Sequence, residues 1–188
     1  MTSALPAQPV RSNEVYAVFC GTIDQNAVQR FFQGMAGVMA NKITGVHILF
    51  QSTGGFIGDG VCLYKFFQSL PVDLTLYNVG TIASIAAIAY LGAKKRKTSA
   101  HATFMIHRSY NFPQAATAAR LQAVTQGLTL DDRRTEAILR QHITLSEEKW
   151  AELNYNDLVF SGPEAVKIGL AGEVGEFAPP NGTQIYNI

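Results

Sequence analysis

The sequence predicts an α/β fold of stacked βαβ units, because short apolar runs that end at glycine alternate with longer segments of helical period. The chain has 188 residues, of which 47% are hydrophobic, so it is long enough to bury a full core without covalent staples. No internal repeat or Pro/Gly-rich linker divides it. We therefore expect a single domain over residues 1–188, with a flexible N-terminus over residues 1–14.

The first half of the chain carries the alternation of strands and helices. Val15–Cys20 predicts a buried strand, and Asp24 is placed to cap a helix whose apolar residues recur at the 3.6 period. The elements expected next continue this order: a strand at Val46–Phe50, a helix at Ile57–Ser69, a strand at Leu74–Val79, a short buried helix at Ser84–Leu91 and a strand at Ala102–Ile106. In such sheets a site normally lies where the carboxyl ends of strands meet helix N-termini.

The second half of the chain is predicted to be mainly helical. Gln114–His142 is rich in alanine and leucine, and we expect a helix over about residues 114–143, long enough to project from the core. Ser146 precedes two glutamates, which favours a new helix start. Ser161–Glu164 is a capping box that opens a short helix. A last strand is expected at Gly172–Gly175, followed by a loose tail.

Charge and hydropathy exclude several classes of protein. Fifteen basic and fourteen acidic residues give a net charge of +1, so no global field favours nucleic acid or anionic lipid. The most apolar window, Ile82–Ala93, is shorter than the roughly 18–20 residues of a membrane span. Charged residues make up 15% of the chain, which fits a subunit that buries faces against neighbours and is also compatible with a compact monomer.

The cysteines and the N-terminus indicate the compartment. Cys20 and Cys62 lie in apolar segments, and we expect buried free thiols in a reducing environment. The first fourteen residues lack the basic start and apolar stretch of a secretory signal. We expect a cytoplasmic protein that holds neither a metal nor another cofactor, since none of the four histidines has ligand spacing to a partner.

Three polar features follow predicted strands and could form a site. Ser84 begins an apolar helix, where it could act as a nucleophile beside free backbone N–H groups or simply as an N-cap. His107 ends a strand and could be a general base or a structural histidine. Gly54-Gly55 could be a plain turn, or could present a bare N–H to a substrate carbonyl.

Two further polar segments have an ordinary interpretation beside a functional one. Asp157 could be a turn residue, or the carboxylate that orients His107 and stabilises its imidazolium. Lys94–Lys97 is the chain's charge run. It has no interleaved aromatic residues, so we expect a solvated turn rather than a nucleic-acid contact.

Taken together, these residues resemble the proteolytic subunit of the Clp (caseinolytic) protease family. The matching motifs stand in the family's order and spacing: Ser52-Thr53-Gly54-Gly55 for S-P-G-G, Gly80–Ser84 for G-x-A-[AS]-S, Met105–His107 for M-I-H, and Asp157 four residues before Ser161–Ala165 for S-A-x-E-A. Thr53 replaces a proline, and Asn156 replaces an arginine that helps to lock two rings together. About fourteen residues precede the first strand, so the chain looks like a short, divergent member.

The resemblance implies a fold, an activity and partners. The fold would be the stacked βαβ units of Clp-like and crotonase-like proteins, with the helix at 114–143 as a projecting handle. A Ser84–His107–Asp157 triad would cleave peptides or unfolded proteins, with an oxyanion hole from the N–H groups of Gly55 and Ile85. The subunits would form rings, usually of seven and often stacked in pairs, and a hexameric ATPase unfoldase would feed them in ATP-dependent proteolysis.

Two alternatives remain open at this point. A ring-forming scaffold, non-catalytic or latent, would keep the shell without aligning Ser84, His107 and Asp157. A crotonase-type acyl-CoA enzyme would share the fold and the oxyanion hole. It would use carboxylates rather than a Ser–His pair, and nothing in the sequence indicates a site for CoA.

Overall fold

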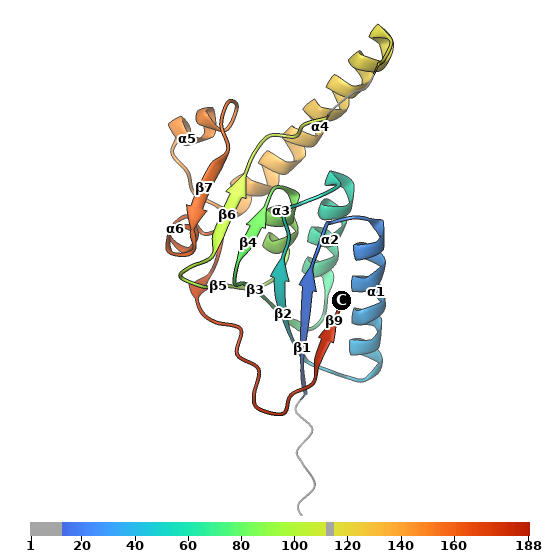
Figure 1. Ribbon diagram of the computed structural model, residues 1–188, viewed down its shortest axis with the longest axis vertical. Helices are drawn as coiled ribbons and strands as arrows, with labels where there is room; N and C mark the ends of the chain where they lie inside the picture. Colours follow the sequence, from blue (N-terminus) through green and yellow to red (C-terminus); the bar gives the residue numbers. More distant parts are fainter. Residues whose placement is uncertain (1–12, 112–114) are drawn as a thin grey trace, which may run out of the picture.

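Six strands form the larger sheet, and every neighbouring pair in it is parallel. The computed structural model describes residues 13–111 and 115–188. In spatial order the strands are β8 (Glu173–Val174), β5 (Lys95–Thr98), β3 (Asp73–Asn78), β2 (Gly45–Gln51), β1 (Glu14–Cys20) and β9 (Ile185–Asn187). Parallel neighbours require crossover connections, which explains the alternation of strands with helices (Figure 1).

A second sheet of three strands stands at the carboxyl ends of the first. It contains β4 (Thr81–Ala83), β6 (Thr103–Ile106) and β7 (Leu158–Ser161), in that order. The β4–β6 pair is parallel and the β6–β7 pair is antiparallel. An isolated bridge between Ser52 and Ile82 joins the chain after β2 to β4. The ends of β2, β4 and β6 are therefore brought to one region of the molecule.

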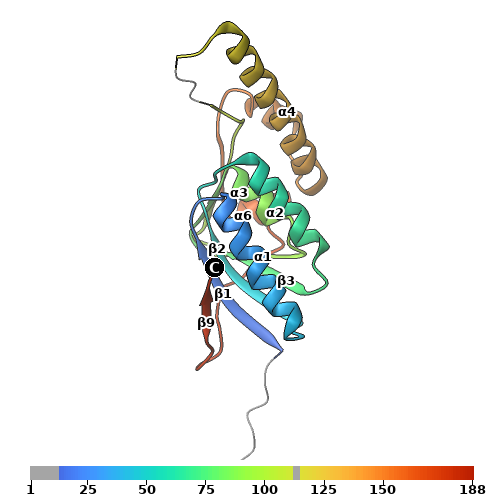
Figure 2. The same ribbon diagram turned by 90° about the vertical axis from the view of Figure 1, so that its right-hand side faces the viewer.

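Three helices pack on the larger sheet or between the two sheets. They are α1 (Gln25–Ala40), α2 (Ile57–Ser69) and α3 (Ile85–Leu91), and Figure 2 shows α1 and α2 side by side on one face. Asp24 caps α1 as predicted, since its Oδ1 accepts the N–H of Ala27 at 2.8 Å. Every residue of α3 is buried. This apolar, alanine-rich helix is therefore a core element that fixes the residue preceding it, Ser84.

The remaining helices follow β6. They are α4 (Ala118–His142), α5 (Glu147–Glu152) and α6 (Gly162–Ile168). Among the 25 residues of α4, those that are buried, Ile138 and Leu139, lie near its C-terminal end. The rest of α4 extends away from both sheets (Figures 1 and 2). The predicted projecting helix is therefore present, although Gln114, where its expected range begins, lies outside the described residues.

The structure corrects the prediction for Lys94–Lys97. Most of that segment belongs to β5, a strand of the larger sheet, rather than to a solvated turn. Pairing with β3 and β8 supplies backbone partners. The lysines find carboxylates on those same strands, Lys95 with Asp73 at 3.1 Å and Lys97 with Glu173 at 3.0 Å.

The cysteines and both chain ends also differ from expectation. Cys20 and Cys62 are free but exposed, because each points to the outer side of its element while neighbouring residues face the core.

The tail expected to be loose forms β9, which pairs with β1. Residues 1–12 of the expected flexible N-terminus lie outside the described residues, and Glu14 already belongs to β1. None of the helices in the described ranges is long and apolar enough to cross a membrane.

Candidate active site

Ser84 occupies the N-cap position of α3 in a rare backbone conformation. Its φ is 58° and its ψ is −135°, a region that residues with a side chain seldom adopt. The backbone is held there by a hydrogen bond of 2.8 Å from its N–H to the carbonyl of Met105 in β6. The side chain accepts no capping hydrogen bond. The hydroxyl is therefore directed elsewhere, and the N-cap interpretation of this serine does not hold for its side chain.

His107 lies within hydrogen-bond distance of that hydroxyl. It is the residue after β6, and its Nε2 is 2.7 Å from Ser84 Oγ. The ring of Tyr110 packs against the imidazole, with a centroid distance of 5.3 Å. A neutral imidazole at this distance is placed to take a proton from the serine hydroxyl. The structure thus brings together the two residues that the sequence suggested as nucleophile and base.

Asp157 is opposite His107 in the chain register but makes no hydrogen bond or ion pair with it. The last pair of the β6–β7 ladder is Ile106 with Leu158, so His107 and Asp157 are the next residues on the two antiparallel chains. Asp157 is nevertheless exposed, and it makes no hydrogen bond or ion pair with any residue that the structure describes. Two of the three residues proposed from the sequence are therefore assembled here, and the third is adjacent but unpaired.

Two backbone N–H groups beside Ser84 have no acceptor in the described part of the chain. Ile23 donates to Gly54 O and accepts from Phe56 N, both at 2.8 Å, so the N–H of Gly55 points away from Ile23. Ile85 is the first residue of α3, where an N–H has no intrahelical partner. These are the two residues that the sequence suggested for an oxyanion hole.

Gly55 could not be another residue without a change in the backbone. Its φ is 155°, and a Cβ atom there would lie 2.1 Å from the carbonyl oxygen of Ile23. The close approach of the two chain segments is what leaves the N–H of Gly55 on the side away from Ile23. This is the physical reason for a glycine at this position.

A small hollow of about 30 Å³ adjoins Ser84 and His107, and its other polar lining residues are Arg108, Ser109 and Thr135. Its apolar walls come from α2, α3, β6 and α4, and they are formed by Ile57, Ile85, Ile88, Ile106 and Leu139. A hollow of this lining and position could receive an apolar group attached to a carbonyl at Ser84.

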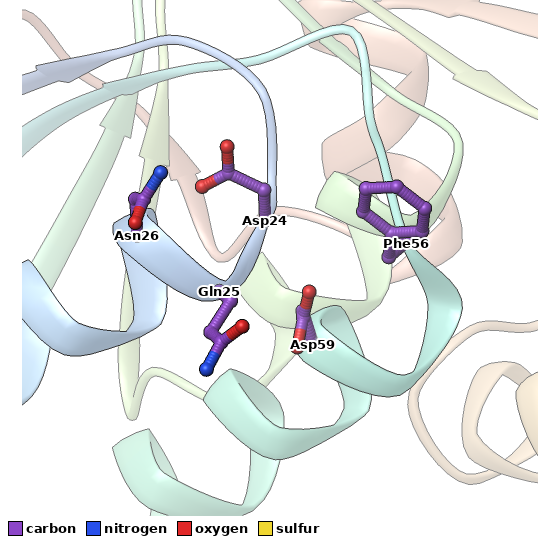
Figure 3. A pocket seen from close by; sticks show the side chains of 5 residues that line it. All are labelled: Asp24, Gln25, Asn26, Phe56 and Asp59. Atoms are coloured by element: carbon purple, nitrogen blue, oxygen red, sulfur yellow. The ribbon is translucent and has the colours of Figure 1, made fainter.

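A larger hollow of about 520 Å³ lies beside Phe56, the residue that precedes α2. Figure 3 shows the side chains that line it, which come from the N-terminal turns of α1 and α2: Asp24, Gln25, Asn26, Phe56 and Asp59. Phe56 is 69% exposed. No feature of the sequence signalled this hollow, because the capping role of Asp24 accounts for that residue on its own.

No cluster of three or more potential metal ligands occurs among the residues that the structure describes. The groups gathered at Ser84 are a hydroxyl, an imidazole and backbone N–H groups. Such a set can add a nucleophile to a carbonyl and stabilise the oxyanion that results.

Comparison with known proteins gives one family. The family model described as Clp protease matches residues 11–177. Over 131 residues, the chain is 28% identical to the ATP-dependent Clp protease proteolytic subunit 2 of Chlamydia trachomatis serovar D, covering 69% of this chain. The protein of the same name from Chlamydia pneumoniae is 27% identical over 131 residues. The matched stretch spans 64% of the length of these curated relatives.

The fold itself has a solved counterpart. A ClpP1 mutant from Listeria monocytogenes superposes with a TM-score of 0.75 at 18% sequence identity. The match covers 88% of this chain and 92% of the Listeria chain. At this identity the likeness concerns the arrangement of helices and strands. It confirms the α/β fold predicted from the sequence.

Proposed function

Because the chain belongs to the Clp protease family, we propose that it is a serine endopeptidase that cleaves peptides or unfolded proteins inside an oligomeric ring. The observation that carries this proposal is the distance of 2.7 Å between His107 Nε2 and Ser84 Oγ, at a serine whose hydroxyl does not cap its helix. The proposed chemistry uses side chains and backbone groups of this chain and requires no cofactor.

The proposed reaction proceeds by acylation of Ser84. His107 takes the hydroxyl proton as Oγ attacks the peptide carbonyl, and later gives it to the leaving amine. The N–H groups of Gly55 and Ile85 stabilise the oxyanion. Asp157 is proposed as the third member of the triad, which requires its carboxylate to reach the imidazole from its present exposed position. Water then hydrolyses the acyl-enzyme by the same route.

The assembly and its partner are proposed from the family. Rings of subunits would enclose the sites and restrict access to extended chains. The curated relatives are named as ATP-dependent, and a hexameric ATPase unfoldase is the corresponding partner proposed for this chain. We place this activity in the cytoplasm.

A latent or non-catalytic ring subunit is the second candidate. The unpaired, exposed Asp157 favours it, because a triad without its carboxylate leaves the imidazole without the group that orients it. A latent enzyme and a scaffold differ in whether Ser84 can be made reactive.

Labelling with a fluorophosphonate probe tests the proposal. Wild-type protein, Ser84→Ala and a control, Ser69→Ala at the exposed end of α2, are labelled in parallel, and the native mass of each is measured. Labelling of the wild type and of Ser69→Ala but not of Ser84→Ala is expected, in a ring of unchanged mass. A well-formed ring that is never labelled at Ser84 would support the scaffold.

A further inference from the structure

Arg108, the residue after His107, joins two segments that are distant in the sequence. Its Nε and Nη2 donate to Oδ1 of Asn154 at 3.1 and 2.7 Å. The same Nη2 is 2.7 Å from Oε2 of Glu136 in α4. The Arg108 and Glu136 side chains are 25% and 24% exposed, so the pair is partly shielded from water. A planar guanidinium with several fixed donors is suited to hold two acceptors at once.

Asn154 ties this contact to the segment that carries Asp157. It lies three residues before Asp157, in the connection between α5 and β7. The β6–β7 register places Asp157 opposite His107. The Arg108–Asn154 hydrogen bond joins the two chains just beyond the last residue pair of that strand pairing. The contact therefore restricts how far the chain segment of Asp157 can move from His107.

Glu136 links the Arg108–Asn154 contact to α4, in which it lies, and through Arg140 to α5. It accepts a second hydrogen bond, of 2.8 Å, from Arg140 Nε. Arg140 in turn reaches Glu147 at 3.3 Å and lies 4.3 Å from the ring centre of Trp150 in α5. Burial opposes the ionisation of Glu136, but the hydrogen bonds from Arg140 and Arg108 outweigh it and lower the pKa of this carboxyl. Glu136 is thus a charged anchor between the two arginines.

A second contact fastens the segment after His107 to α4. The backbone N–H of Ser109 donates to Oδ1 of Asp132 at 2.7 Å. Asp132 and Glu136 are one helical turn apart, so both contacts are made by the same side of α4. The chain immediately after His107 is therefore fixed to α4 at two successive residues.

We propose that Arg108 is a positioning residue, which holds the Asn154–Asp157 segment opposite His107 with Glu136 of α4 as its anchor. This inference rests on the proposed function of the same site and adds to it a residue that lines the hollow beside Ser84 but makes no hydrogen bond to Ser84. Arg108 acts by keeping the carboxylate of Asp157 within reach of the imidazole. Its loss leaves the serine and histidine in place but frees the segment of the third residue.

Arg108→Met tests the proposal, with Arg134→Met as the matched control. Arg134 also lies beside α4's acidic residues, but its ion pair is with Asp131 on the same helix, at 2.7 Å. In Arg108→Met we expect kcat and the rate of fluorophosphonate labelling to fall about 10- to 100-fold, the cost of a displacement of roughly 1 Å in such a site. The loss is expected mainly in kcat rather than in KM, because the apolar walls of the hollow beside Ser84 are retained although Arg108 also lines it.

A conservative variant separates the planar contact from the positive charge alone. Arg108→Lys should remain closer to Arg108→Met than to wild type, because an ammonium group cannot reproduce the planar contact with Asn154 and Glu136.

A second variant, Asn154→Ala, tests the same contact in case Arg108→Met fails to fold. Asn154→Ala removes the acceptor and leaves Arg108 paired with Glu136. If the two residues act through one contact, the double variant Arg108→Met/Asn154→Ala should be no slower than the more affected single variant. Losses that multiply would overturn the proposal.

Amide exchange distinguishes this inference from the proposed function. Faster exchange is expected in both 107–111 and 154–158 for Arg108→Met, compared with Arg134→Met, whether or not the protein is active. Unchanged exchange in either segment overturns the positioning role. A wild type that is never labelled at Ser84 counts against the proposed peptidase alone. A labelled wild type with an equally fast Arg108→Met counts against the positioning role alone.

Discussion

A Cβ atom on Gly54 would lie 2.7 Å from Cβ of Ser84 and 3.1 Å from its Oγ. The turn after β2 and the serine at the start of α3 are therefore in contact at a distance that only a glycine permits. Gly54 also has a φ of 110°, which residues with a side chain rarely adopt. The geometry of Ser84 depends on a residue thirty positions earlier in the sequence.

Gly54→Ala is expected to lose at least about 100-fold in labelling at Ser84, because the added methyl group displaces the hydroxyl from His107. Gly37→Ala in α1 is the control, since nothing lies within 4 Å of a Cβ atom there. Labelling rates of the two variants, measured on assemblies of equal mass, check this. Equal rates would show that the contact does not constrain Ser84.

The backbone of Ser84 predicts a difference between two inactive variants. Both Ser84→Ala and Ser84→Gly remove the hydroxyl, but only glycine relieves the strain of a φ of 58°. We expect Ser84→Gly to be the more stable of the two by about 1 kcal/mol, after allowing for the greater freedom of glycine in the unfolded chain. Denaturant unfolding of the two variants measures it, and a less stable Ser84→Gly would contradict the strain.

His142 predicts a loss of stability in mild acid. Gln68 Nε2 donates to the hydroxyl of Tyr64, which leaves that O–H to donate to Nε2 of His142 at 2.9 Å. Burial, with help from Arg96 and Lys65, lowers the pKa of His142 from its usual 6.5. As the pH falls, the imidazole of His142 is therefore protonated in the unfolded chain before it is protonated in the folded one. The free energy of unfolding should fall as the pH drops from about 6.5 through the lowered pKa of His142 in the folded protein.

Unfolding midpoints between pH 7.5 and 5 check the role of His142. His142→Gln should flatten the decline, while His101→Gln, at an exposed turn before β6, should leave it as in the wild type. If both variants decline like the wild type, His142 is not the group responsible.

Asp24 predicts a local contribution to stability at the start of α1. Asp24→Ala should lower the free energy of unfolding by about 1 kcal/mol, because the N–H of Ala27 loses its acceptor. Asp24→Asn keeps a capping oxygen and should cost much less. Urea unfolding of the two variants decides it, and equal losses would show that charge rather than the cap stabilises this helix.

The sequence predicted the elements whose formation depends on neighbouring residues in the chain. The cap at Asp24 and the capping box at Ser161–Glu164 are both present, because a side chain and an N–H three residues later need no other partner. The same holds for α3, whose apolar residues predicted a buried helix. The α/β class followed from the order of these local patterns.

Strands that depend on distant partners were missed. Lys95–Thr98 carries a charge run typical of a turn, but β3 and β8 supply its backbone partners and its carboxylates. Ile185–Asn187 forms a strand because the edge of β1 is available to it. A strand is stable only beside another strand, so its own residues do not determine it. The exposure of Cys20 and Cys62 has a similar origin, since it depends on which face meets the core.

The sequence by itself determined which residues could form the site, because serine, histidine and glycine at the ends of predicted strands limit the possible chemistry. The tertiary structure decided how they are related. It brought Ser84 to 2.7 Å from His107, left Asp157 exposed, and joined Arg108 to Asn154 and Glu136. These distances depend on how β4, β6, β7 and α4 pack together. Local sequence indicates where a helix begins and ends, and only packing among elements fixes what each end faces.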